Sequence, residues 1–259
     1  MARNYHFSAI AWRSEVGLHR ESNEDSALIA EDLIAVADGM GGYVGGEIAS
    51  RTVISELAEV HRLLSDPDVD LDSKEDIYSS SVAAMDAAIA TVAAENPHLS
   101  GMGTTLTSLA IMDNNAVLLH IGDSRAYRIR GKKITQLSHD HTVVQELIDQ
   151  GRLTADEVAD HPQRSLLTQA LMGNRTIESV LLAFPLEDGD IFLLCSDGLS
   201  SVVDEAKIAG AFTGDLQASI DSLIELTYKN GAPDNVTIVA AKIGEMKFET
   251  APIKIGAAS

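Results

Sequence analysis

The sequence predicts an α+β protein whose sheets are antiparallel. Three observations lead to this fold class. Apolar runs of strand length follow one another with turn residues between them, and two long helical stretches are adjacent in the chain. The regular alternation of strand and helix that builds a parallel sheet is missing from the pattern. With 259 residues, of which 45% are hydrophobic, the chain can bury a sizeable core in one domain.

The N-terminal half is expected to place its first strands before two helices. The strands are predicted from apolar runs at 7–12, 27–29 and 33–37. A first helix is predicted over 47–64, where apolar residues recur at helical spacing. A second is predicted over 74–95, which is rich in alanine and stops before Asn96-Pro97.

The C-terminal half returns to strands around a polar insert. Strands are predicted at 104–112, 116–121, 126–129, 179–184, 190–195 and 236–243. Hairpin turns at 113–115 and 130–132 are expected to join the first three of these strands. A helix is expected at 216–229. The polar segment 138–174 is predicted to be a mostly helical insert. We expect one domain over 1–247 and a flexible tail over 248–259, which has no periodicity.

Composition excludes several classes of protein. With 19 basic and 39 acidic residues the formal charge is −20, so the surface would repel a nucleic-acid backbone. The single Cys195 excludes an intramolecular disulfide and a zinc–thiolate cluster. The apolar runs 9–12 and 82–94 are too short for a signal-peptide core and for a membrane span, respectively. We therefore expect a monomeric, cytoplasmic protein with no nucleic-acid partner and no membrane segment.

Four aspartates stand at the ends of predicted strands. Asp38 and Asp197 each follow a fully apolar run and precede glycine, Asp234 precedes the last strand, and Asp123 lies between two strands. Asp-Gly is also a common turn signal, and Asp123 could simply pair with Arg125. A carboxylate beside a core strand is costly to bury unless a cation pairs with it, which favours a metal site.

A further acidic cluster, Glu24-Asp25, follows Arg20. In an extended segment Arg20 and Glu24 would share one face, with Asp25 on the other. Arginine is suited to binding phosphate with two hydrogen bonds, although a surface salt bridge to Glu21 or Glu24 is an equal alternative.

The glycine-rich loop 38–46 lies between a strand and a helix, as a dinucleotide-binding loop does. It departs from that motif because Val44 holds the third glycine position and Asp38 would repel a pyrophosphate. We expect its glycines to let the backbone fold closely around a metal, with the Gly39 carbonyl as a ligand.

Taken in order, these motifs resemble the metal-dependent protein phosphatase family of the 2C type (PPM), particularly its bacterial Ser/Thr phosphatases. The resemblance rests on Arg20 with Asn23-Glu24-Asp25, Asp38-Gly39-Met40-Gly41-Gly42, Gly103-Thr104-Thr105, Gly122-Asp123-Ser124-Arg125, Ser196-Asp197-Gly198-Leu199 and Asp234-Asn235-Val236-Thr237. It implies a four-layer α-β-β-α sandwich with two central antiparallel sheets. The insert 138–174 is similar to the helical flap of the bacterial members.

The resemblance also implies roles. Asp38 would bridge two divalent metals, the Gly39 carbonyl, Asp197 and Asp234 would complete their ligands, and Glu24 would act through bound water. Asp25 and Asn235 would support these ligands, and Asp123 with Asp197 would hold a third, weaker ion. Arg20 would bind the substrate phosphate, and a metal-bridging water would attack it. Possible substrate contacts are Tyr43, Arg152 and Arg164.

The implied function is hydrolysis of phosphoserine and phosphothreonine in proteins, including a Ser/Thr kinase, with Mn²⁺ or Mg²⁺. All-oxygen ligation selects these ions over zinc or copper. Met40 replaces the histidine proposed as general acid in many eukaryotic members, so the proton donor is unassigned. The alternative is an inactive PPM-like protein that binds partners, against which the complete acid set argues.

Overall fold

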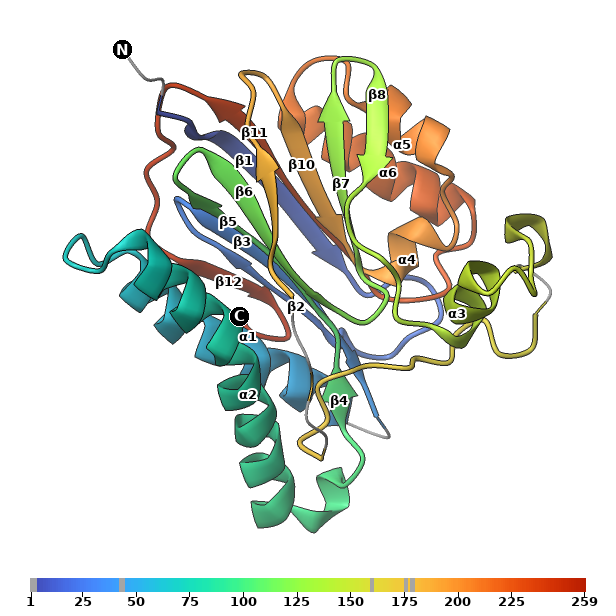
Figure 1. The fold of residues 1–259 in the computed structure, drawn as a ribbon. Helices are drawn as coiled ribbons and strands as arrows, with labels where there is room; N and C mark the ends of the chain where they lie inside the picture. The colour runs from blue at the N-terminus through green and yellow to red at the C-terminus, as the bar shows by residue number, and fades with distance from the viewer. Residues whose placement is uncertain (1–3, 42–44, 159–160, 175–176, 178–179) are drawn as a thin grey trace.

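The computed structural model describes residues 4–41, 45–158, 161–174, 177 and 180–259. Two antiparallel sheets lie face to face, and helices cover the outer face of each (Figure 1). The predicted α+β class and the antiparallel pairing are confirmed.

The first sheet has five strands and contains the first and the last of the strands predicted from the sequence, at 7–12 and 236–243. Its order is β1 (His6–Glu15), β11 (Val236–Gly244), β10 (Ile191–Cys195), β7 (Arg125–Arg130) and β8 (Lys133–Gln136). Helices α4 (Asp197–Ser200), α5 (Glu205–Ala211) and α6 (Leu216–Lys229) lie on its outer face. Strand β8, which the apolar pattern did not predict, pairs with β7 through the turn at 131–132.

The second sheet has seven strands and packs against the two long helices. Its order is β12 (Ile253–Gly256), β2 (Asp25–Ile29), β3 (Leu33–Met40), β5 (Leu106–Met112), β6 (Asn115–Ile121) and β9 (Leu182–Pro185), with β4 (Gly103–Thr104) paired to β3. The long helices are α1 (Gly45–Leu64) and α2 (Leu71–Glu95). Of the strand expected at 179–184, residue 179 lies outside the described residues and the strand itself begins at Leu182.

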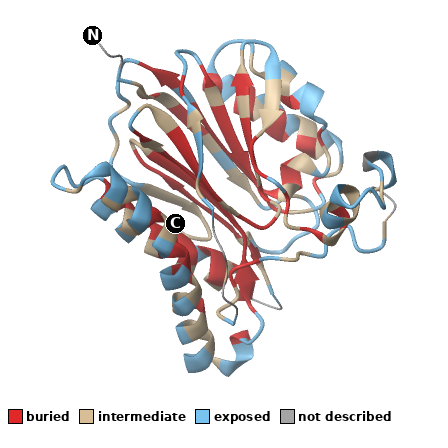
Figure 2. Cartoon of the chain, in the orientation of Figure 1, coloured by how far each residue is buried: buried red, intermediate tan, exposed pale blue. Residues whose placement is uncertain are grey.

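Buried residues follow the strands and the inner faces of the helices (Figure 2). Their apolar members form three clusters that separate the four layers. One lies between α1, α2 and the seven-stranded sheet, one between the two sheets, and one between the five-stranded sheet and α4–α6. Strand β3 shows how a single strand serves two of them. Leu33 and Ala35 face the helices, whereas Ile34 and Val36 face the other sheet.

Helix α2 packs against the seven-stranded sheet along one face, although only 28% of its most apolar 18-residue stretch is buried. Tyr78, Val82, Met85 and Ile89 are buried, and the Tyr78 hydroxyl donates to Ser108 Oγ at 2.7 Å. Among the described residues α2 is long and apolar enough to cross a membrane by length and composition. Its N-terminus is capped by Asp70, whose side chain accepts from the Ser73 amide.

The insert between β8 and β9 projects beside the sheets and carries α3 (Val143–Asp149) and the short 3₁₀ turn η2 (Ala155–Glu157) (Figure 1). A second 3₁₀ turn, η1 (Pro97–Leu99), follows α2. Isolated bridges from Thr142 to Leu167 and from Thr104 to Leu171 fasten the insert at its base.

The tail after Lys247 was expected to be flexible, and this expectation is wrong. Residues Ile253–Gly256 form β12, which pairs antiparallel with β2 along its whole length. The Phe248 amide donates to the Phe7 carbonyl at 2.7 Å, and Ile253 and Ile255 pack against the core between the sheets. A short strand of four residues has too little periodicity to reveal a partner more than 200 positions earlier in the chain.

Truncation after Lys247 should therefore destabilise the protein. It removes β12 and two partly buried isoleucines, so we expect the free energy of unfolding in urea to fall by about 2–4 kcal/mol. Truncation after Gly256 keeps β12 and should cost less. Equal unfolding midpoints for the full chain and the chain truncated after Lys247 would contradict a structural role for β12.

Candidate active site

The predicted acidic residues meet where the apolar core between the sheets comes to an end. Along β3 the side chains of Ile34 and Val36 face the opposite sheet, and Asp38 is the next residue in that alternation. Asp25 lies directly opposite Asp38 on β2. Alternation therefore brings both carboxylates to the same end of the gap between the sheets.

The five-stranded sheet supplies the facing side of this site. Strand β10 ends at Cys195, directly before Ser196 and Asp197, and β11 begins just after Asp234 and Asn235. Because β7 pairs with β10, with Arg125 opposite Cys195, the turn that contains Asp123 lies beside Asp197. Strand ends from both sheets thus converge on one place.

A cavity of about 910 Å³ opens at this convergence. It is lined by five of the predicted acidic residues, by the predicted arginine and glycine, and by residues of the insert. The predicted residues in its lining are Arg20, Glu24, Asp38, Gly39, Asp123, Asp197 and Asp234. The structure therefore brings together residues that are up to 214 positions apart in the chain.

Two glycines allow the backbone to approach this acid cluster closely. A Cβ atom on Gly39 would lie 2.1 Å from the Gly46 carbonyl oxygen and 2.5 Å from the Glu24 carbonyl oxygen. A Cβ on Gly46 would lie 2.9 Å from the Glu24 carboxyl carbon. Any larger residue would push the loop away from Glu24, which explains why the sequence carries glycine at both positions.

The negative charges of these buried carboxylates are poorly balanced by positive charge. Burial raises the pKa of Asp38 well above its usual range, and four neighbouring carboxylates raise it further. Burial likewise raises the pKa of Asp25 to about 7 and that of Asp123 to about 7. The pKa values of Asp197 and Glu24 are also raised, in each case mainly by burial. Closely spaced acids out of water favour either protonation or a bound cation.

Among the described residues that line this cavity, Arg20 supplies the positive charge. Its guanidinium donates to Asp234 at 2.6 Å and lies 3.9 Å from Glu24. The local pairing with Glu21 or Glu24 that the sequence also permitted is thus a minor part of its contacts. Its side chain remains 46% exposed, so it can reach a ligand in the cavity.

Hydroxyl and amide groups hold the acids in place. Ser196 Oγ donates to Asp25 Oδ2 at 2.7 Å, and Thr105 Oγ1 accepts from the Asp38 amide at 2.9 Å. Asn235 Oδ1 accepts from the Glu24 amide at 2.8 Å, and its Nδ2 donates to two carbonyls of the segment before Glu24. Asn235 therefore organises the loop that carries Glu24.

The site has the chemistry of a divalent-cation site. Within the described residues, no group of three or more His, Cys, Asp or Glu side chains is arranged as a ready-made metal cage. The donors are nevertheless all oxygen atoms, and Asp25 Oδ1 is buried without a hydrogen-bond partner. An acid cluster with raised pKa values and an unsatisfied carboxylate oxygen fits Mg²⁺ or Mn²⁺, which bind hard oxygen ligands.

The three residues proposed as substrate contacts differ in their position relative to the acidic cavity. Tyr43 lies outside the described residues. Arg152 is exposed on the insert and does not line the cavity. Arg164 lines a neighbouring groove of about 810 Å³, which shares Asp123, Ser165 and Asp197 with the acidic cavity.

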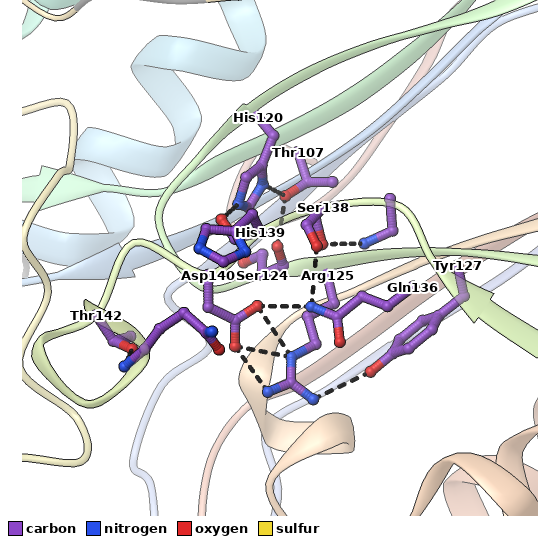
Figure 3. Close-up of polar contacts among 12 residues, drawn as sticks. Thr107, His120, Ser124, Arg125, Tyr127, Gln136, Ser138, His139, Asp140 and Thr142 are labelled. Atoms are coloured by element: carbon purple, nitrogen blue, oxygen red, sulfur yellow. Dashed lines mark hydrogen bonds and ion pairs between the residues drawn. The ribbon is translucent and has the colours of Figure 1, made fainter. Parts of the chain in front are cut away.

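A polar network that the sequence did not reveal joins the insert to the Asp123 turn (Figure 3). The Arg125 guanidinium binds both carboxylate oxygens of Asp140, so Arg125 is not the local partner of Asp123. His120 contacts Thr107 Oγ1 at 2.9 Å and the His139 carbonyl at 3.0 Å, so both of its ring nitrogens have a partner. Burial lowers the pKa of His120 to about 3.

Comparison with known proteins identifies relatives with this arrangement. Residues 21–230 match the family model described as Protein phosphatase 2C. The serine/threonine protein phosphatase PstP of Mycobacterium tuberculosis is 44% identical over 251 residues, which cover 96% of this chain and 48% of PstP. The protein phosphatase PhpP of Streptococcus pneumoniae is 32% identical over 250 residues, which cover 93% of this chain and 99% of PhpP. The chain thus spans about half the length of the first curated relatives it matches.

Solved structures show the same fold. A crystal structure of M. tuberculosis PstP aligns with a TM-score of 0.83 at 44% identity, over 90% of this chain and 97% of the other. The PstP catalytic domain in complex with two manganese ions aligns with a TM-score of 0.83 at 40% identity, over 93% and 99% of the two chains. The four-layer arrangement described above is therefore shared with these structures.

The acid cluster should make the metal-free protein less stable as the pH rises. Asp25 and Asp123 bind protons up to about pH 7 when folded but only to about pH 4 when unfolded, so between these values the folded state holds more protons. Stability is then lost with increasing pH. We expect the Tm in EDTA to fall by roughly 5–10 °C between pH 5.5 and pH 8.

Saturating Mn²⁺ should reduce this slope, because the cations neutralise the carboxylates. Asp25→Asn should reduce it as well, without metal. Melting curves of the EDTA-treated protein that are flat or rise over this range would show that the acids are not strained in the metal-free fold.

Proposed function

The chain belongs to the protein phosphatase 2C family, and we propose that it is a metal-dependent phosphatase of phosphoserine and phosphothreonine in proteins. One observation carries this proposal. Within the part of the chain that the structure describes, one cavity gathers five carboxylates and one arginine from segments at the strand ends of both sheets. Relatives in sequence are named serine/threonine phosphatases, and PhpP is named a protein phosphatase. The complete acid set disfavours the alternative of an inactive binding protein, for which such a cluster is only a cost.

Two divalent cations, Mn²⁺ or Mg²⁺, would be held mainly by Asp38, Asp197 and Asp234. The carbonyl of Gly39 and the Glu24 carboxylate are the further oxygen donors in the lining. Support comes from the raised pKa values of the buried acids and from the two manganese ions named for the PstP catalytic domain. Asp25, behind these ligands, would orient them through Ser196.

A third, weaker ion would be held by Asp123 and Asp197. These two carboxylates line both the acidic cavity and the groove beside the insert, so an ion between them would be more open to exchange. Burial and the neighbouring Asp197 raise the pKa of Asp123, which supports a shared cation at this position.

The chain's own residues prepare the phosphate for hydrolysis. When bound, the cations would supply an acidified water as nucleophile and neutralise charge on the phosphate. Arg20 would bind the phosphate oxygens and set the orientation of the phosphorus atom. Met40 lines the cavity but has no proton to give, so it does not protonate the leaving oxygen.

We further propose that the insert contacts the polypeptide around the phosphorylated residue. Arg164 and Ser165 line the groove beside the acidic cavity, and Arg152 is exposed on the same insert. Basic side chains there suit a phosphorylated, negatively charged partner in an otherwise acidic protein. Phosphorylated proteins, including a Ser/Thr kinase, would be the substrates of a cytoplasmic, monomeric enzyme.

Hydrolysis should depend on metal and on Asp38. We expect Mn²⁺-dependent turnover of p-nitrophenyl phosphate and of a phosphothreonine peptide, abolished by EDTA. Asp38→Asn removes a charge that binds the cations and should lower kcat by roughly a thousandfold. Asp190→Asn also changes a buried aspartate, but it lies at the opposite end of β10 and should retain activity.

No turnover by the metal-loaded protein, with normal phosphopeptide binding, would instead support the inactive alternative. Near-normal turnover by Asp38→Asn would remove Asp38 from the metal ligands.

Arg20→Ala should act on substrate binding. Loss of charge-assisted hydrogen bonds to phosphate should raise KM for p-nitrophenyl phosphate roughly 10–100-fold, with Mn²⁺ binding retained. Arg13 is the matched control, since it is 44% exposed against 46% for Arg20 and also pairs with two acids. A KM for Arg20→Ala equal to that of Arg13→Ala would exclude Arg20 from phosphate binding.

A further inference from the structure

Arg125 lies between two competing sets of carboxylates. It is the first residue of β7, two positions after Asp123, and it pairs across the sheet with Cys195, two positions before Asp197. Its side chain lines the same groove as Asp123 and Asp197. An arginine so placed is a permanent positive charge beside the two acids, because guanidinium does not lose its proton in proteins.

In the structure Arg125 turns to a third acid, Asp140 at the base of the insert (Figure 3). Its Nε lies 2.9 Å and its Nη2 2.7 Å from Asp140 Oδ2, and Nε also lies 3.1 Å from Oδ1. Nη1 donates to the Tyr127 hydroxyl at 3.2 Å. Gln136 donates to Asp140 Oδ1 at 2.9 Å. The carboxylate of Asp140 is thus fixed from two sides and is only 8% exposed.

The base of the insert is itself fastened to the Asp123 turn. The His141 amide donates to the Gly122 carbonyl at 2.8 Å, and the Gly122 amide donates to His141 Nδ1 at 3.1 Å. The His120 and His141 rings stack with centroids 5.0 Å apart. Asp140 therefore cannot withdraw without disturbing the turn, and it holds Arg125 in a defined direction.

The charges around the Arg125–Asp140 ion pair affect whether a cation can bind nearby. Asp123, Asp197 and Asp140 carry three negative charges and Arg125 one positive charge, so the group is net negative when ionised. Without the charge of Asp140, Arg125 would be an uncompensated cation in a partly buried site, and Asp123 and Asp197, which line the same groove and feel its charge, could then attract it. It would then occupy or repel the position of a metal ion between them.

We propose that Asp140 is a positioning residue that keeps Arg125 turned away from Asp123 and Asp197, so that this acid pair stays open to a divalent cation. The inference rests on the third ion of the proposed function. It assigns a role to the base of the insert: the insert supplies the counter-charge that keeps an internal arginine from competing with metal.

The test is a titration of Mn²⁺ binding to the metal-free protein by calorimetry and by electron paramagnetic resonance of free Mn²⁺. In Asp140→Asn the two tight ions should bind as in the wild type, whereas the third should weaken about tenfold or more. Arg125→Gln combined with Asp140→Asn restores the net charge and should return the third affinity to within about threefold of wild type. Arg125→Gln alone should tighten the third ion.

Arg130 and Asp190 provide a matched control on the same two strands. Arg130 is the last residue of β7, and it binds both oxygens of the buried Asp190 at 2.6 and 2.7 Å, far from the acid cluster. Asp190→Asn breaks an equivalent pair and should lower the Tm without changing any Mn²⁺ affinity. Loss of the third ion in this control as well would show a general effect of destabilisation and would overturn the proposal.

The remaining outcomes are equally decisive. A wild-type protein that binds only two Mn²⁺ ions but hydrolyses phosphopeptides would overturn the inference and leave the phosphatase function intact. A third ion that binds Asp140→Asn as tightly as wild type would overturn the inference alone. Should Asp140→Asn fail to fold, Arg125→Gln alone decides, because a third affinity that is unchanged or weaker in that variant contradicts the proposed competition.

Discussion

The interaction on which this structure depends is the repulsion among carboxylates at one end of the core between the sheets. Strands from both sheets alternate apolar side chains into that core, and at its end the alternation continues with Asp25 and Asp38 in place of isoleucine and valine. Hydroxyl and amide groups of Ser196, Thr105 and Asn235 then hold the acids and their loops. The fold thus concentrates negative charge where water is scarce, which is the condition under which divalent cations bind strongly.

The local features of this arrangement could be predicted from the sequence. An acidic residue directly after an apolar run, as at Asp38 and Asp197, indicates a carboxylate beside a buried strand, and the structure places both residues in the lining of the cavity. Strand β3 itself continues past Asp38 to Met40. The glycines at 39 and 46 signalled a close approach of the backbone, and Gly39 and Gly46 do meet each other and Glu24. These features depend on residues that are close together in the sequence, so the sequence pattern alone can predict them.

The partners of charged groups could not be predicted, because tertiary structure chooses them. Arg20 pairs mainly with Asp234, and Arg125 with Asp140, although each has an acid closer to it in sequence. The tail strand β12 was missed for a related reason, since its pairing with β2 depends on a contact across almost the whole chain. Local pattern shows where charge accumulates, and only the assembled layers show how it is balanced.

The unsatisfied oxygen of Asp25 links this chemistry to the lifetime of the protein in the cell. A fold with strained carboxylates gains stability by mass action from any cation that binds only the folded state. The fraction of molecules that open transiently, and so become targets for proteases, therefore depends on the supply of free manganese or magnesium. A cell that is short of these ions would therefore hold less of the folded protein, because a larger fraction of its molecules would be open to degradation until the ions returned.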